Sequence, residues 1–124
     1  MYKTILIVIL LLIIVYLLMC ASSSSLINSS IQKLIKQSAR WAIASENDIS
    51  PLIKVLHANY AAGYLWAVTD IATSSDIENA TGIDILKFTK KITDIQDSAN
   101  KKIMEVCPSY MGDIDPYLTA IAET

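Results

Sequence analysis

The chain opens with a long segment that is almost free of polar residues. Residues Ile5 to Ala21 are all hydrophobic, mostly Ile, Leu and Val, and no charge interrupts them. At about 1.5 Å per residue, a helix over this segment is roughly 26 Å long, close to the hydrocarbon thickness of a thin bilayer. We therefore predict that residues 1–21 form a single transmembrane anchor or signal-anchor, in contact with lipid through residues 5–21.

A cleaved signal peptide is the competing interpretation of this segment. Lys3 supplies the positive charge of such a signal, and Ala21-Ser22-Ser23 offers small residues for cleavage. However, the hydrophobic run exceeds the roughly 7–15 residues that a signal usually contains, which favours an anchor. Lys33, Lys36 and Arg40 follow within 20 residues of Ala21. By the positive-inside rule, they favour a cytoplasmic C-terminal domain.

After a four-serine spacer at residues 22–25, apolar residues recur at the spacing of a helix. This pattern predicts a first helix from about residue 26 to Ser45. This helix can continue from the anchor, because four serines weaken a helix without breaking it. Ser50-Pro51 predicts the start of a second helix that runs to about Thr73, with Ser as N-cap and Pro at the first helical position.

Two further helices are expected. The string Ser75-Asp76-Ile77-Glu78 indicates a capping box for a short third helix, which Gly82 can end in a left-handed conformation. A fourth helix is predicted from about Asp84 to Val106, where apolar residues recur in steps of three and four. We interpret this seam as internal packing rather than an intermolecular coiled coil, because three heptads are few for a coiled coil.

No stretch alternates with a period of two, so the predicted fold class is all-α. The organisation that follows is an N-terminal transmembrane helix and a small bundle of three to four helices over residues 26–107. A C-terminal loop and short helix are expected over residues 108–124. About 100 residues suffice to bury a core without metals or disulfides.

Composition narrows the possible functions. Lys and Arg total 10 against 12 Asp and Glu, which argues against a nucleic-acid-binding protein, since such proteins normally carry a basic stripe. Three Gly and three Pro argue against a turn-rich β fold and against disorder. Two Cys cannot build a disulfide framework or a Cys-rich zinc site. No phosphate-binding loop or catalytic motif is present, and we predict no cofactor.

The second helix carries the candidate functional residues. His57, Tyr60 and Tyr64 are spaced to lie on one face, and Trp66 lies on an adjacent face. One interpretation is a polar pocket with His57 as acid, base or ligand. The other is a core helix whose Tyr hydroxyl and His ring nitrogen atoms reach hydrogen-bond partners or water at the rim of the bundle. The same residues could also form an interaction face.

The chemistry available around His57 favours the second interpretation. The chain has no other His, and no Cys or Glu-x-x-His pair lies near it to complete a metal site. The carboxylates of Asp48 and Asp70 lie beyond the ends of the predicted helix. We therefore do not predict an enzyme.

The second helix is also apolar nearly all round, which predicts a central position in its domain. Val55 to Thr69 is free of charge, but it is too short and too polar for a second membrane span, so we expect a buried core helix. Gly63 lies in the middle of this helix, where glycine is unfavourable. Its presence predicts close approach of another backbone.

Four positions are candidates for covalent modification. Cys20 lies at the predicted membrane boundary, where it could be palmitoylated or link two chains, while Cys107 ends the fourth helix. The simplest interpretation of both is an unmodified thiol. Asn28 and Asn79 match the N-glycosylation pattern, which matters only if the domain is lumenal.

Two strings carry a resemblance to known proteins. Arg40-Trp41-Ala42, and His57-Ala58-Asn59-Tyr60-Ala61-Ala62-Gly63-Tyr64-Leu65-Trp66-Ala67 with Asp70-Ile71, resemble small, N-terminally anchored helical proteins of large nucleocytoplasmic DNA viruses of algae and protists. The resemblance covers roughly residues 33–107. It implies a virion with an internal membrane and many small anchored proteins, and it brings no catalytic residues.

Together, these observations predict a single-pass, membrane-anchored helical protein with a structural or interaction role and an unidentified protein partner. The resemblance places it in a virion or host membrane, as a virion membrane or capsid-associated component. The alternative is a secreted or lumenal helical domain that binds a ligand after signal-peptide cleavage.

Overall fold

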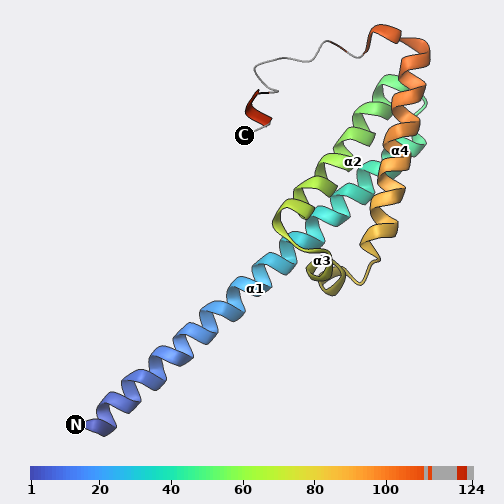
Figure 1. The fold of residues 1–124 in the computed structure, drawn as a ribbon. Coiled ribbons are helices and arrows are strands. Elements are labelled where there is room, and N and C mark those ends of the chain that lie inside the picture. Colours follow the sequence, from blue (N-terminus) through green and yellow to red (C-terminus); the bar gives the residue numbers. More distant parts are fainter. Residues whose placement is uncertain (111, 113–119, 123–124) are drawn as a thin grey trace.

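The computed structural model describes residues 1–110, 112 and 120–122, and within this part all regular secondary structure is helical. The predicted all-α class is confirmed. Figure 1 shows the N-terminal half of the first helix projecting from a bundle, in which the rest of that helix packs with the second and fourth. The elements are α1 (Tyr2–Asn47), α2 (Pro51–Ile71), α3 (Ser74–Thr81), α4 (Ile85–Val106) and a 3-10 turn at Pro108–Tyr110.

α1 is one uninterrupted helix of 46 residues that runs from the apolar segment into the bundle. The serine spacer lies inside it: the hydroxyls of Ser23 and Ser24 each donate a 3.1 Å hydrogen bond to the carbonyl oxygen four residues earlier. Such bonds let serine stay within a helix. The first buried residue is Ile31, so about 15 Å of exposed helix separates Ala21 from the core.

α1 and α2 are antiparallel, and two buried serines of α1 join them. The Ser38 hydroxyl donates to the carbonyl oxygen of Ala61 at 2.8 Å, and the Ser45 hydroxyl donates to that of Lys54 at 2.8 Å. Their small side chains allow the helices to approach closely while each hydroxyl keeps a partner. Pro51 occupies the first turn of α2 as predicted, although the Ser50 side chain makes no capping bond.

The capping box of α3 lies two residues earlier than the position predicted from the sequence. The Thr73 hydroxyl accepts from the backbone N–H of Asp76 at 3.2 Å, and the Asp76 carboxylate accepts from the Thr73 backbone N–H at 3.1 Å. The prediction of a box at residues 75–78 is therefore wrong. Because α2 ends at Ile71, Thr73 is already extended and can act as the cap. Gly82 ends α3 in the left-handed conformation, at φ 72°, as predicted.

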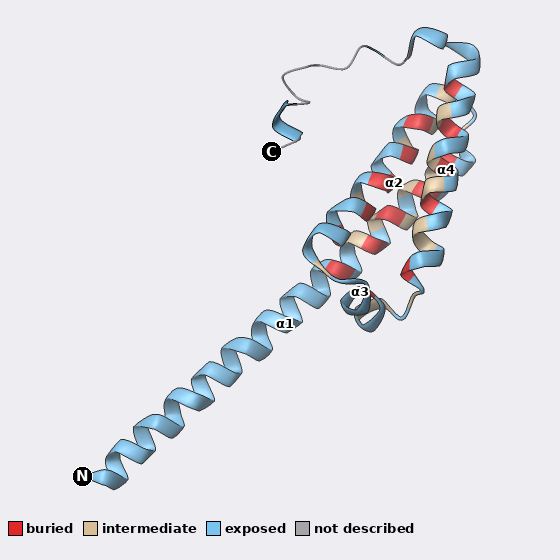
Figure 2. Cartoon of the chain, viewed as in Figure 1, coloured by how far each residue is buried: buried red, intermediate tan, exposed pale blue. Residues whose placement is uncertain are grey.

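α4 begins after its N-cap Asp84, whose carboxylate accepts from the Lys87 backbone N–H at 3.0 Å. Its apolar seam packs inside the bundle, mainly against α2 and less against α1. Figure 2 shows the buried residues on the sides of α1, α2 and α4 that face one another. Most of the C-terminal helix predicted within residues 108–124 lies outside the described residues.

The buried hydrophobic residues of the core are all aliphatic, and the partly buried rings of Trp41 and Phe88 pack against them. These buried residues are Ile31, Ile35, Ala42, Val55, Ala58, Ala61, Ala62, Leu65, Val68, Ile77, Ile85, Ile92, Ile95, Ala99 and Ile103.

Candidate interaction surface

Only one side of α2 is buried, although the helix is apolar nearly all round. The buried side comprises Val55, Ala58, Ala61, Ala62, Leu65 and Val68. The opposite side is solvent-exposed, with Leu52 57% and Trp66 46% exposed. We call this side the outer face of α2; it comprises Leu52, Leu56, Asn59, Tyr60, Gly63, Trp66 and Ala67. The predicted central position of α2 between α1 and α4 is confirmed, but these two helices cover adjacent sides and leave the third side uncovered.

The outer face of α2 also differs from the other outer surfaces of the bundle in charge. No Asp, Glu, Lys or Arg occurs between Lys54 and Asp70. By contrast, the exposed residues of α4 include Lys87, Lys90, Lys91, Asp94, Asp97, Lys101, Lys102 and Glu105, and those of the bundle part of α1 include Lys33, Lys36 and Arg40. An uncharged apolar patch with charged surroundings is typical of an interaction site.

Gly63 lies near the middle of the outer face, and no helix packs against it. A Cβ atom added at Gly63 would meet no other atom within 4 Å, apart from its own helix. The prediction that another backbone of the bundle approaches Gly63 is therefore wrong. Gly63 instead lies on the exposed side of α2. No contact within this chain requires a residue without a side chain at this position.

A shallow hollow of about 350 Å³ surrounds Gly63. It extends from the outer face toward α1 and is mainly apolar. Of the predicted residues, Tyr60 and Tyr64 both contribute to it. Its lining comprises Leu34, Asn59, Tyr60, Gly63, Tyr64 and Ala67.

His57 lies at the edge of the α1–α2 contact rather than in a pocket inside the bundle. Its Nδ1 is 2.6 Å from Oδ2 of Asp48, the residue that caps the C-terminus of α1, and the two side chains are 21% and 23% exposed. The Trp41 ring lies with its centroid 4.9 Å from that of His57 and 5.1 Å from that of Tyr60. This cluster therefore closes the turn between the two helices.

The chemistry of this cluster is limited to one imidazole and one carboxylate. Within the described residues, no group of three or more His, Cys, Asp and Glu side chains could hold a metal ion. The contacts of His57 are thus those of a structural hydrogen-bonded pair packed on aromatic rings, which stabilises the helical hairpin. The pairing of His57 with Asp48 was not predicted from the sequence. It depends on the extended backbone of Asp48, which turns the chain from the end of α1 back toward α2.

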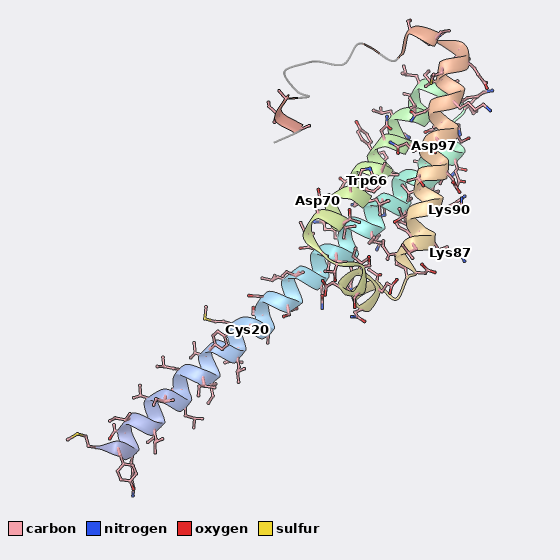
Figure 3. All side chains as sticks on the ribbon, in the orientation of Figure 1. Cys20, Trp66, Asp70, Lys87, Lys90 and Asp97 are labelled. Atoms are coloured by element: carbon pink, nitrogen blue, oxygen red, sulfur yellow. The ribbon has the colours of Figure 1, made fainter. Side chains whose placement is uncertain are left out.

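The four predicted residues do not form one site. Tyr60 and Tyr64 lie at the hollow beside Leu34 of α1, and His57 contacts the α1 terminus. Trp66 instead lies on the side of α2 nearer α4. Asn59, two turns earlier on the same side, contacts α4: its Oδ1 accepts a hydrogen bond from Gln96 Nε2 at 2.9 Å. Figure 3 shows Trp66 and Asp70 on α2 across from the charged side chains of α4. What these residues share is one helix: Tyr60 and Trp66 are exposed on its outer face, whereas His57 and Tyr64 are only partly exposed.

The candidate modification sites are all accessible. Cys20 and Cys107 are exposed free thiols, and they lie on the projecting part of α1 and at the far end of α4, so they cannot pair within one chain. Asn28 is exposed on α1, and the Asn79 side chain donates to the Ser75 hydroxyl at 3.3 Å.

Comparison of the chain with protein families, with curated proteins and with solved structures gave no match.

Proposed function

We propose that this chain is a single-pass membrane protein whose helical bundle presents the outer face of α2 to a protein partner. The observation that carries the proposal is the combination of two exposed apolar surfaces on one rigid helical unit. One is the N-terminal segment of α1, and the other is the uncharged outer face of α2.

Membrane insertion accounts for the first surface. All residues from Ile5 to Ala21 are exposed, and this part of α1 is long and apolar enough to cross a membrane. At about 0.3–0.6 kcal/mol for each Leu, Ile or Val, insertion of such a segment is favourable by roughly 4–8 kcal/mol.

The position of α2 separates it from the bilayer. It packs beside the bundle part of α1, where Ser38 meets Ala61 and Ser45 meets Lys54. With residues 5–21 in the membrane, α2 lies in the aqueous phase. Its outer face is therefore available to a protein and is not a second span.

The resemblance to small anchored viral proteins supports a place for this protein in a virion membrane, beneath or beside a capsid. The same architecture suits that setting, because a straight α1 holds the bundle at a defined distance from the bilayer. We therefore propose a structural, interaction-mediating role in such a membrane.

A photo-crosslinking experiment in the native membrane tests this proposal. A benzophenone amino acid replaces Tyr60 on the outer face in the full-length protein, and Asp97 on the exposed side of α4 in the matched control. We expect protein adducts from position 60 and none from position 97. Equal adduct formation, or none at either position, would contradict a docking role for the outer face.

Intact mass distinguishes the anchored protein from its alternative. A membrane protein with an uncleaved anchor retains the full 13.6 kDa. A product shortened near Ser23 would instead identify a secreted or lumenal domain.

A further inference from the structure

We infer that the bilayer also covers the serine spacer and the two apolar residues after it, so that the lipid-embedded part of α1 ends at Ile27. The near end of the bundle then rests on the lipid headgroups. The inference rests on the proposed function of α1 as a membrane anchor. It changes which residues contact lipid: the span comprises residues 5–27, and the end of α2 lies at the membrane surface.

The apolar run alone is short for a membrane span. The seventeen residues from Ile5 to Ala21 form about 26 Å of helix, whereas an average hydrocarbon core is about 30 Å thick and takes about 20 residues. The N-terminal side supplies little of the missing length, because Lys3 and the amino terminus are charged. Extension in the other direction meets no charge before Lys33.

The serines of the spacer are compatible with hydrocarbon. α1 continues through them without a break, so their backbone groups remain bonded within the helix. The hydroxyls of Ser23 and Ser24 each donate, at 3.1 Å, to the carbonyl oxygen four residues earlier. A hydroxyl that its own helix satisfies costs less in lipid than an unpartnered one.

Leu26 and Ile27 are exposed apolar residues between the spacer and the bundle. They are 69% and 52% exposed, and they precede Ile31, the first buried residue of α1. A span that ends at Ile27 places both side chains in hydrocarbon, where each is favourable. Residues 5–27 form about 34 Å of helix, which crosses a core of about 30 Å with a modest tilt.

The register of α1 and α2 identifies the part of the bundle that lies nearest this boundary. The hydrogen bond from Ser38 to Ala61 pairs the two antiparallel helices. Ten residues farther toward the anchor, Ile71 of α2 lies level with Asn28 of α1. Ile71 ends α2 and is 57% exposed. A span that includes Ile27 brings this side chain to the hydrocarbon boundary, whereas one that stops before the spacer would hold it about 10 Å away.

The contact with the membrane surface is apolar rather than electrostatic. Figure 1 shows α3 at the end of the bundle from which the N-terminal part of α1 projects, and Gln32 of α1 donates to the Ala80 carbonyl oxygen at 2.7 Å there. Most exposed charges of α3 and of the adjoining turns are acidic, and the cytoplasmic surface of anionic lipids repels them. The headgroups that fit this end are therefore zwitterionic. These charged residues are Asp70, Asp76, Glu78 and Lys33.

This boundary changes the surroundings of Cys20. Cys20 lies on the projecting part of α1 (Figure 3), seven residues or about 10 Å below Ile27. A thiol at that depth is surrounded by hydrocarbon, which a charged reagent does not enter. A span that ended at Ala21 would instead leave the thiol within reach of the headgroup layer.

The two native cysteines provide the first test. The unaltered full-length protein is reconstituted in phosphatidylcholine vesicles with a charged maleimide on both sides, and mass spectrometry locates the label. Cys107, exposed at the end of α4, is the internal control. We expect Cys20 to react roughly tenfold more slowly or less, because moving a charge into hydrocarbon costs more than the free energy of a factor of ten. Comparable rates for the two thiols would overturn the inference.

Spin labelling then locates the boundary itself. Ser22→Cys or Ser29→Cys, two positions on one side of α1, is introduced into the full-length protein with Cys20→Ala and Cys107→Ser. A nitroxide at each position meets oxygen, which concentrates in hydrocarbon, and a water-soluble nickel chelate. We expect the ratio of oxygen to nickel collisions at position 22 to exceed that at position 29 by roughly tenfold, because hydrocarbon excludes the chelate.

Two reference positions distinguish failure of the inference from failure of the anchor. Leu12→Cys reports the collision ratio of hydrocarbon, and Ser98→Cys, on the exposed side of α4, reports that of water. If position 22 matches position 98 while position 12 retains the hydrocarbon ratio, the span ends before the spacer and the inference is overturned, although the anchor stands. If position 12 also matches position 98, the proposed anchor is excluded together with the inference.

The end of α2 is tested by a matched pair of labels in the same protein. Ile71 and Leu52 are equally exposed, at 57%, and lie at opposite ends of α2. We expect severalfold fewer nickel collisions at Ile71→Cys than at Leu52→Cys, because headgroups and hydrocarbon shield only position 71. Equal collision rates would overturn the contact between this end of the bundle and the membrane surface.

Discussion

Ser45 and Lys54 are joined by two reciprocal hydrogen bonds across the turn between α1 and α2. The Ser45 hydroxyl donates to the Lys54 carbonyl oxygen at 2.8 Å, while the Lys54 ammonium donates to the Ser45 carbonyl oxygen at 2.6 Å. The ammonium also reaches the Glu46 carbonyl oxygen at 3.2 Å. A cation at this position satisfies carbonyl groups of the last turn of α1 and complements the negative end of its dipole.

Substitution of Ser45 tests how tightly α1 and α2 pack. Ser45 is 1% exposed. We expect Ser45→Ala to cost about 1 kcal/mol through the lost hydrogen bond, and Ser45→Leu about 1–3 kcal/mol or more through overpacking. Thermal melts of a fragment beginning at Ser25 measure both. Ser98→Ala, on the exposed side of α4, serves as control, and an unchanged melting midpoint for Ser45→Leu would contradict the close packing.

Substitution of Gly63 by alanine is expected to raise the stability of the fold, whereas substitution of Ser45 lowers it. Because open space surrounds it, Gly63→Ala should stabilise the fragment by about 0.5–1 kcal/mol through improved helix propensity. Gly63→Leu should likewise be tolerated, since no neighbouring atom stands in its way. The same melts provide the measurement, and destabilisation by Gly63→Leu in dilute monomer would show a close neighbour at this position.

The apolar segment should be dispensable for folding and necessary for membrane attachment. The fragment beginning at Ser25 retains every core residue, since the core starts at Ile31. We expect it to be soluble and helical by circular dichroism. The full-length protein should remain in the membrane pellet after a carbonate wash, and its release would exclude a transmembrane anchor.

The cap of α3 predicts a local loss of stability on substitution. Thr73→Ala removes the hydroxyl that accepts from Asp76 and should cost about 1 kcal/mol. For a domain of this size, that loss lowers the melting temperature by roughly 4–8 °C. Ser74→Ala, one residue later and outside the cap, should change it little.

The same cap predicts acid sensitivity. Hydrogen bonds from the Thr73 hydroxyl, and then from its backbone N–H, lower the pKa of Asp76 below the ordinary value of 3.8. A lowered pKa in the folded state stabilises the fold above the unfolded pKa, and this contribution is lost as pH falls through the folded pKa. We expect Asp76→Asn to remove this contribution and thus reduce the difference in unfolding free energy between pH 6 and pH 2.

The sequence by itself determined the helices and most of their ends. Pro51, Gly82 and Asp84 mark boundaries through local backbone chemistry, so they could be identified without knowledge of the tertiary contacts. The spacing of apolar residues likewise identified the inward side of α4. The apolar segment was evident because seventeen consecutive hydrophobic residues need no partner to be recognised.

Only the tertiary structure decided which side of α2 is buried. A helix that is apolar all round has no periodicity to distinguish its faces, and the number of neighbouring helices determines how much of it they cover. The exposure of Gly63 and Trp66 and the pairing of His57 with Asp48 therefore could not be predicted. They depend on the way α1 and α4 pack against α2, which is a property of the assembled bundle rather than of any local segment.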